Sequence, residues 1–213
     1  MFTGLIETIC TVKSVGQSLG GAVLTVDLGE LAKDSKIGDS IAINGACLTV
    51  AELRDNLATF QLSAETLIKS ALGRLKPSSP VNVERAMKAT DRFGGHFVLG
   101  HIDGTAAIKA IQTHGDFADI IFAADRELLD QMVVKGSVAV NGISLTIANM
   151  DDHSFSVAII PQTLKRTTLG TAKVGDAVNI ETDMIVKTIQ KQLAKILPQE
   201  QTLTVERLKE LGF

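Results

Sequence analysis

Two side chains with distinct chemistry occupy matching places in a short sequence that the chain contains twice. The first copy is Asn44-Gly-Ala-Cys47-Leu-Thr-Val50, and the second is Asn141-Gly-Ile-Ser144-Leu-Thr-Ile147. A thiol becomes a nucleophile when it ionises, whereas a serine hydroxyl donates and accepts hydrogen bonds. Cys47 has the alternative of being a small core residue, and Ser144 that of satisfying strand-edge backbone groups. The difference between the copies predicts two related sites that play different parts in one reaction.

Further polar residues stand in the second copy where the first copy has another residue: His101, Lys135, Gln162 and Asp183. The spacing of His96 and His101 also fits a metal site, but no third His or Cys ligand lies nearby in the sequence. We therefore interpret His101 as a proton carrier or hydrogen-bonding group rather than a metal ligand. Asp183 has the alternative of capping the helix that follows it, and Lys135 that of being solvated.

Each copy of the short sequence is expected to form a β-hairpin. Asn-Gly between two apolar alternating runs is a strong hairpin signal, because both residues tolerate the positive φ of a type I′ turn. Alternation then assigns the side chains to two faces. The core face of the first hairpin holds Ile41, Ile43, Leu48 and Val50, and the small polar face holds Ser40, Ala42, Cys47 and Thr49. A two-residue loop pairs Ser40 with Thr49, Ala42 with Cys47 and Ile43 with Ala46.

The repeat extends well beyond the hairpins. The offset of 97 positions that joins Asn44 to Asn141 also joins residues 65–73 to 162–170 and 81–84 to 178–181. A one-residue slip joins residues 4–7 to 100–103. The sequence therefore predicts two similar domains, at residues 1–97 and 98–184.

Within each repeat the local signals are mostly those of β-strands. Six short strands in a unit of this size are typical of a small barrel that closes on itself. A short helix is expected at Glu65–Ser70. The strands of the first repeat are predicted at Leu5–Val15, Ala22–Leu28, Ser40–Ile43, Ala46–Ala51, Ala58–Leu62 and Val81–Ala86.

Residues 185–213 follow a different pattern. Apolar residues recur at helical spacing from Ile185 to Leu197, Pro198 ends this helix, and a second short helix is expected at Thr204–Leu211. An amphipathic helix outside both repeats needs an apolar surface to pack on. The helix either straps across its own barrels or contacts other chains of an oligomer.

Composition narrows the class of protein. The 213 residues carry 21 Lys and Arg against 24 Asp and Glu, and the basic residues are scattered, which argues against nucleic acid and anionic membranes as partners. The N-terminus has no secretory signal pattern and no run is long enough to span a bilayer. We therefore expect a cytoplasmic protein in which Cys10 and Cys47 stay reduced. Because Trp and Tyr are absent, an aromatic ligand is expected to rest on aliphatic side chains and backbone.

Several motifs in the same order resemble the riboflavin synthase family, and the resemblance covers the chain from its first residue to Phe213. The motifs are Met1-Phe-Thr-Gly4, Asn44-Gly-Ala-Cys47-Leu-Thr, Gly94-Gly-His96-Phe-Val-Leu-Gly100-His101-Ile-Asp-Gly104, Asn141-Gly-Ile-Ser144-Leu-Thr and Pro161-Gln-Thr-Leu-Lys-Arg-Thr-Thr-Leu-Gly170. Leu99 departs from the serine that the family often has, and Gln162 from a common His or Glu.

The resemblance implies a mostly β fold with two six-stranded Greek-key barrels in tandem and a C-terminal helical segment, residues 185–213, that joins three chains. The family transfers a four-carbon unit between two molecules of 6,7-dimethyl-8-ribityllumazine, giving riboflavin and 5-amino-6-(ribitylamino)uracil, the last step of riboflavin biosynthesis. It uses no cofactor and no metal. The active site lies between the N-terminal barrel of one subunit and the C-terminal barrel of the next. Lumazine synthase is a further partner that the resemblance allows.

The resemblance also places substrate-binding segments at matching positions in both halves. The ring is expected along strand backbones, with ribityl hydroxyls on Thr66 and Thr163 and with Lys135 near a ring carbonyl. The binding residues of the first half are Gly4, Leu5, Ile6, Cys47, Leu48, Thr49, Gln61, Leu62, Ser63, Ala64, Glu65 and Thr66. Those of the second half are Gly100, His101, Ile102, Ser144, Leu145, Thr146, Ala158, Ile159, Ile160, Pro161, Gln162 and Thr163.

Five residues are candidates for the chemistry: Cys47, Ser144, His101, Asp183 and Ser40. Holding two rings in register contributes up to ~7–11 kcal/mol to catalysis. His101 and Asp183 are expected to move protons, and Cys47 and Ser144 to orient the ring or add to it. The assignment of base and nucleophile among them stays open.

Two other classes of protein fit the tandem barrels. A non-catalytic lumazine- or flavin-binding protein of the antenna type keeps the fold and one ligand site but loses the polar differences between the copies. A scaffold barrel without a ligand predicts apolar or random residues on the face that carries Ser40 and Cys47. The small polar face and the four residues Cys47, Ser144, His101 and Asp183 favour the enzyme over both.

Overall fold

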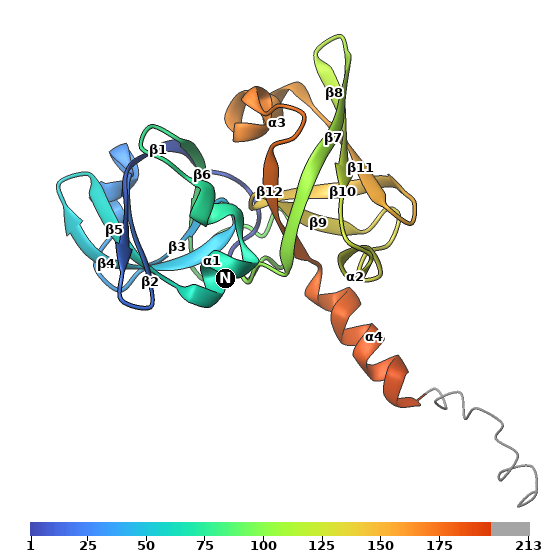
Figure 1. The fold of residues 1–213 in the computed structure, drawn as a ribbon, viewed down its shortest axis with the longest axis horizontal. Coiled ribbons are helices and arrows are strands. Elements are labelled where there is room, and N and C mark those ends of the chain that lie inside the picture. Colours follow the sequence, from blue (N-terminus) through green and yellow to red (C-terminus); the bar gives the residue numbers. More distant parts are fainter. Residues whose placement is uncertain (197–213) are drawn as a thin grey trace, which may run out of the picture.

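Two barrels of similar size lie side by side, and a C-terminal helix leads away from them (Figure 1). This arrangement comes from a computed structural model, which describes residues 1–196. The two tandem barrels confirm the repeat architecture that the sequence predicts. No helix among the described residues is long and apolar enough to cross a membrane.

The first barrel is closed and antiparallel, with the circular strand order β1-β2-β5-β4-β3-β6. Alternation along the strands gives each of them one inward face, as in β2, where Ala22, Leu24 and Val26 are buried. The elements are β1 (Thr8–Ser18), β2 (Gly21–Asp27), η1 (Gly29–Asp34), β3 (Ser40–Ile43), β4 (Ala46–Arg54), β5 (Leu57–Ser63), α1 (Ala64–Lys69), η2 (Ala71–Arg74) and β6 (Pro80–Arg85).

The second barrel repeats this connectivity, with the circular order β10-β11-β8-β7-β12-β9. Closure leaves neither barrel with an unpaired sheet edge. Its elements are β7 (Gly104–His114), β8 (Phe117–Ala123), α2 (Arg126–Leu129), β9 (Ser137–Val140), β10 (Ile143–Met150), β11 (Ser154–Ile159), α3 (Pro161–Arg166), η3 (Thr168–Thr171) and β12 (Ala177–Thr182).

The two Asn-Gly hairpins form with the predicted register. In β3 and β4, Ser40 pairs with Thr49, Ala42 with Cys47 and Ile43 with Ala46. Asn44 has a φ of 45° and Gly45 a φ of 82°, and Asn141 and Gly142 have φ values of 46° and 79°. These left-handed conformations are those of a type I′ turn, so the residue types and the turn geometry agree.

The predicted division of faces is also confirmed for the core side of the first hairpin. Ile41, Ile43, Leu48 and Val50 are buried in the core of the first barrel, around Phe60. Each fully buried side chain of this size contributes about 1.5–3 kcal/mol through removal of apolar surface from water. The second barrel has an equivalent core, in which the rings of Phe122 and Phe155 stack with centroids 5.1 Å apart.

The hairpin turns meet where the barrels touch. A Cβ atom placed on Gly45 would lie 2.6 Å from the backbone nitrogen of Gly142, and one placed on Gly142 would lie 2.8 Å from the Cα atom of Gly45. Each glycine is therefore required twice, because its φ is positive and because the opposite backbone occupies the space of a side chain. This pair marks an approximate twofold axis between the barrels.

Asparagine side chains continue the same symmetric interface. The Nδ2 atom of Asn82 donates to the carbonyl of Asn141 at 3.0 Å, and Nδ2 of Asn179 donates to the carbonyl of Asn44 at 2.8 Å. All four residues are buried. Buried amides need such partners, so these bonds fix the orientation of one barrel on the other.

The N-terminal strand begins later than predicted. We expected a strand over Leu5–Val15, but β1 starts at Thr8. The preceding segment leaves the first barrel, because Phe2 forms an isolated β-bridge with Val98 and is fully buried against Ala42 and Ala139. Of the two apolar residues that we expected to open the strand, Ile6 packs against the core of the second barrel and Leu5 is 51% exposed.

The helix α4 (Met184–Ile196) confirms the first predicted C-terminal helix within the described residues. Ile185, Ile189, Leu193 and Ile196 share one face and are between 47% and 76% exposed, so this face does not pack on the chain's own barrels. Polar contacts instead fix the start of the helix, where the Nζ atom of Lys187 pairs with the Asp103 carboxylate. The helix predicted at Thr204–Leu211 lies outside the described residues.

Candidate active site

A pocket with a volume of about 280 Å³ lies beside Cys47 on the first barrel. Several of the predicted site residues meet here, although they come from distant parts of the chain. The pocket is lined by Ala46, Cys47, Glu65, Thr66, Lys69, Ser70, Gly100, His101 and Ile102. A thiol, an imidazole, a carboxylate and two hydroxyl groups therefore surround one small cavity, and together they offer hydrogen-bond donors and acceptors to a polar ligand.

This pocket is built from both halves of the sequence. The backbone N–H of Cys47 donates to the carbonyl of Gly100 at 2.9 Å. A Cβ atom on Gly100, where φ is 80°, would lie only 2.4 Å from the Cβ atom of Cys47, so only glycine allows this approach. Ile102 then packs against the core of the first barrel.

The matching site on the second barrel is assembled in the same crossed way. The backbone N–H of Ser144 donates to the carbonyl of Gly4 at 2.8 Å, and a Cβ atom on Gly4 would lie 2.6 Å from the Cβ atom of Ser144. Ile6 packs against the core of the second barrel. Residues 4–6 thus contact the second barrel and residues 100–102 the first. From the sequence we had instead assigned each of these predicted binding segments to the site of its own half.

His96 lies at the candidate site around Ser144, where the sequence reasoning did not place it. Its Nδ1 atom lies 2.7 Å from the Oγ atom of Ser144, and its backbone N–H donates to the carbonyl of Thr3 at 3.1 Å. The side chain is 7% exposed, and its Nε2 atom has no hydrogen-bond partner within residues 1–196. Burial lowers the pKa of His96 because it disfavours the imidazolium, and the negative charge of Asp183 opposes this shift.

A comparison of the two repeats was unable to find His96. The segment 98–103 matches residues 2–7 at an offset of 96, so the position that would match His96 precedes Met1. The only signal in the sequence was the His96–His101 spacing, which we considered for a metal site. The structure instead places His96 beside Ser144 and His101 beside Cys47, in separate sites.

An aromatic pair flanks His96. The ring centroids of Phe93 and Phe97 lie 4.7 Å apart, and both side chains are about two-fifths exposed. We expected aliphatic and backbone walls for an aromatic ligand because the chain has no Trp or Tyr. This accessible pair, three residues before and one residue after His96 in the sequence, is a surface of the kind on which a flat ring stacks.

The remaining predicted residues are spread around these two sites. The carboxylate of Asp183 accepts the N–H of Ile185 at 2.9 Å, so it caps α4 as the alternative interpretation proposed. Lys135 has a φ of 68° and occupies the tight turn before β9, where Gly38 stands in the first repeat. Thr163 lies in α3, as Thr66 does in α1.

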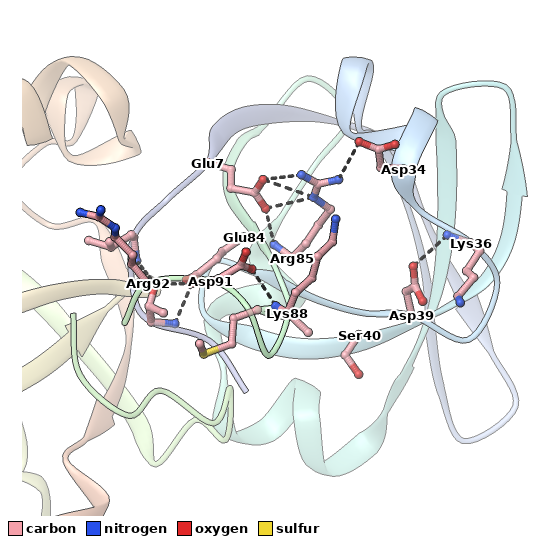
Figure 2. A pocket seen from close by; sticks show the side chains of 14 residues that line it. Glu7, Asp34, Lys36, Asp39, Ser40, Glu84, Arg85, Lys88, Asp91 and Arg92 are labelled. Atoms are coloured by element: carbon pink, nitrogen blue, oxygen red, sulfur yellow. Dashed lines mark hydrogen bonds and ion pairs between the residues drawn. The ribbon is translucent and has the colours of Figure 1, made fainter. Parts of the chain in front are cut away.

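Ser40 lies on the wall of a second pocket, which has a volume of about 630 Å³ (Figure 2). Arg85 pairs there with Glu7 through two nitrogens, at distances from 2.7 to 3.2 Å. Burial works to raise the pKa of Glu7, but the hydrogen bonds and charge of Arg85 outweigh it and lower that pKa. The pocket borders Glu84 and Leu5, so it adjoins the N-terminal segment that leads to Ser144.

Comparison with known proteins shows which family this chain resembles. The family model for the lumazine binding domain matches residues 3–86 and 99–183. The chain is 42% identical over 215 residues to riboflavin synthase of Actinobacillus pleuropneumoniae, with both chains covered in full. This chain belongs to the riboflavin synthase family. Riboflavin synthase of Bacillus subtilis is 40% identical with the same full coverage, and that of Schizosaccharomyces pombe is 39% identical over 90% of this chain and 93% of its own.

Solved structures share the fold. LumP complexed with riboflavin superposes with a TM-score of 0.79 at 21% identity, covering 85% of this chain and 99% of LumP. LumP complexed with 6,7-dimethyl-8-(1'-D-ribityl) lumazine has a TM-score of 0.78. At this identity the likeness shows the tandem-barrel fold alone. The riboflavin synthase family membership rests on the full-length relatives and on the two matched lumazine binding domains.

Proposed function

We propose that the chain transfers a four-carbon unit between two molecules of 6,7-dimethyl-8-ribityllumazine, using the Cys47 site and the Ser144 site for the two partners. One observation carries this proposal. The sites are related by the repeat and share their backbone framework, yet one combines Cys47 with His101 and the other Ser144 with His96. Two copies of one molecule need similar frameworks, and opposite roles in the reaction need different polar groups.

In the proposed binding mode, each ring lies along the strand that carries Cys47 or Ser144. Residues 47–49 and 144–146 and the crossed segments 100–102 and 4–6 line the rings. The ribityl chains run toward 61–66 and 158–163, where Thr66 in α1 and Thr163 in α3 meet the hydroxyls. The pocket beside Cys47 supports this mode, since Thr66, Glu65 and Ser70 line it together with Cys47. Lys135 and Ser40 take supporting positions near the rings.

The proposed chemistry needs a base for a methyl group and a group that adds to or polarises the second ring. A neutral buried imidazole is suited to the first role, and His96 is such a group because its pKa is lowered and its Nε2 atom is unpaired within residues 1–196. Ser144 orients it through Nδ1. Cys47 and His101 act on the second lumazine. The negative charge of Asp183 works to raise the pKa of His96 and so helps it to hold a proton.

We further propose that residues 1–97 and 98–184 act as two lumazine-binding domains, and that 185–213 assemble three chains. The exposed apolar face of α4 supports assembly, because Ile189 and Leu193 lack a partner among the described residues. Sites between the N-terminal barrel of one chain and the C-terminal barrel of the next would bring the two lumazines together. We expect these trimers in the cytoplasm, where the free thiols of Cys10 and Cys47 stay reduced, with lumazine synthase as an optional partner.

The alternative is a protein that binds lumazine or flavin without turnover. Incubation of purified protein with 6,7-dimethyl-8-ribityllumazine separates the two functions. The proposed function predicts catalytic formation of riboflavin, whereas an antenna protein retains the unchanged chromophore. Ligand bound at constant amount with no riboflavin formed would therefore contradict the proposal and support the alternative.

A further inference from the structure

Two buried carboxylates hold the crossed segments in place. The Glu84 carboxylate, 4% exposed, accepts the N–H of Thr3 at 2.7 Å and that of Gly4 at 3.0 Å. The Glu181 carboxylate, 3% exposed, accepts the N–H of Leu99 at 2.7 Å and that of Gly100 at 2.9 Å. Charge-assisted bonds of this kind are stronger than neutral ones, so each carboxylate is a firm anchor for its segment.

Each anchored segment then contacts the site on the opposite barrel. Glu84 belongs to β6 of the first barrel. In the segment that it holds, the carbonyl of Gly4 accepts the N–H of Ser144 and the carbonyl of Thr3 accepts the N–H of His96. Glu181 belongs to β12 of the second barrel, but the carbonyl of Gly100 accepts the N–H of Cys47 in the first.

We propose that Glu84 and Glu181 are positioning residues that act crosswise, so that the carboxylate of each barrel sets the geometry of the site on the other barrel. Glu84 positions the His96–Ser144 pair. Glu181 positions the wall of the Cys47 pocket, including His101, which follows Gly100 directly. This inference rests on the proposed function only in naming these two places as the substrate sites.

The two anchors differ in one bond. The Oγ1 atom of Thr3 gives Glu84 a third hydrogen bond at 2.8 Å, whereas Leu99, the matching residue, has no hydroxyl to give Glu181. Burial raises the pKa of both carboxyls, and that of Glu181 rises to about 7. Lys187 lowers the pKa of Glu181 and Asp103 raises it, and these two charges are paired with each other at 2.8 Å. The N–H groups of Leu99 and Gly100 work to lower this pKa, so their bonds are stronger to the charged carboxylate. Protonation of Glu181 near neutral pH would relieve the cost of burying the charge but release one backbone N–H, so these anchoring bonds weaken as pH falls.

Cysteine alkylation in the full-length protein tests the crossed arrangement without relying on turnover. Gly100 covers Cys47, so Glu181→Gln at pH 8 is expected to accelerate iodoacetamide labelling of Cys47 by about fivefold, the effect of roughly one lost hydrogen bond. Glu84→Gln is the matched control and should leave this rate unchanged. In a protein that carries both Cys47→Ser and Ser144→Cys, Glu84→Gln should accelerate labelling of the thiol at position 144. Glu181→Gln should leave that labelling rate unchanged.

Cys10 reports any general loosening of the first barrel. It is 6% exposed and burial raises its pKa to about 11, so it should stay unlabelled in all variants. Parallel labelling of Cys10 and Cys47 would overturn the proposal, since it indicates unfolding.

The pH dependence of labelling gives a further check. The rate of Cys47 labelling in Glu181→Gln, divided by the wild-type rate, should fall toward one as the pH is lowered from 8 to 6, because Glu181 of the wild type then becomes protonated. Dividing the two rates removes the pH dependence of the alkylation reaction itself.

Leu99→Thr gives a second variant with the opposite expectation. It copies the third donor of the first anchor into the second and should slow labelling of Cys47, which loss of folding does not do. A Cys47 rate that responds to Glu84→Gln instead of Glu181→Gln, or to neither Glu181→Gln nor Leu99→Thr, contradicts the crossed arrangement. If riboflavin forms but the crossed pattern is absent, only this inference fails. If the crossed pattern appears without riboflavin, only the proposed function fails.

Discussion

The Nδ1 atom of His96 lies 2.7 Å from the Oγ atom of Ser144, and both residues are bound by the N-terminal segment that precedes β1. Thr3 accepts the backbone N–H of His96 and Gly4 that of Ser144. The pair is therefore fixed both through its side chains and through its backbone, as catalytic proton transfer requires.

Replacement of His96 tests its assignment as the base. His96→Gln should lower kcat by about 10²–10⁴-fold, the usual contribution of a general acid–base group, and should change KM much less. His114→Gln is a matched control, because His114 is exposed on β7 and pairs only with Asp119 among the described residues. Steady-state riboflavin formation by both variants makes the comparison. A His96→Gln enzyme with unchanged kcat would remove this residue from the chemistry.

Glu181 should make stability fall as pH rises toward neutrality. Its pKa is raised from the ordinary 4.5 to about 7, so between these values the native state keeps a proton that the unfolded chain has lost. The free energy of unfolding then decreases with pH across this window, by ~3 kcal/mol at most.

Urea unfolding followed by circular dichroism at several pH values between 4.5 and 8 measures this slope, since the chain has no Trp or Tyr for fluorescence. Subtracting the Glu181→Gln curve from the wild-type curve cancels other titrating groups, including His96. The difference should decline with rising pH. A flat difference would mean that Glu181 titrates at its ordinary pKa.

The contact between the hairpin turns should make Gly45 intolerant of a side chain. Gly45→Ala has to accommodate both a positive φ and the backbone of Gly142 at 2.6 Å, and we expect a loss of about 3 kcal/mol or more. Gly20→Ala is the matched control. Gly20 has the same φ of 82°, but no atom of residues 1–196 lies within 4 Å of the position that its Cβ atom would take, so only about 1–2 kcal/mol should be lost. Equal losses would contradict the close packing of the turns.

The apolar face of α4 should carry the oligomer. Ile189→Asp combined with Leu193→Asp is expected to reduce the mass in sedimentation analysis from three chains to one and to abolish most riboflavin formation, with the barrels still folded by circular dichroism. Lys191→Asp changes a charge on the same helix without removing an apolar side chain and should keep the larger mass. A trimer that survives the double substitution would exclude this face from the interface.

The repeat made much of the fold predictable. Asn44-Gly45 and Asn141-Gly142 determine their turns through local φ preferences, and strict alternation assigns Ile41 and Leu48 to the core, so local chemistry alone was sufficient. The closed barrels follow from the number of short strands in each copy.

The crossing of the segments was not predictable in this way. Leu5 and Ile6 are apolar residues that would suit a strand of either barrel. Which barrel the segment joins depends on the contact of Gly4 with Ser144, far along the chain. His96 was missed for a related reason, because it has no counterpart in the first repeat. Long-range packing decided both features, and sequence periodicity does not contain it.

The most direct test of the proposed function measures both products when the purified protein meets 6,7-dimethyl-8-ribityllumazine. A lumazine dismutase is expected to consume two lumazines for each riboflavin and each 5-amino-6-(ribitylamino)uracil formed, over many turnovers. Lumazine that stays bound and unchanged, or riboflavin formed without the pyrimidine, would contradict the proposed function.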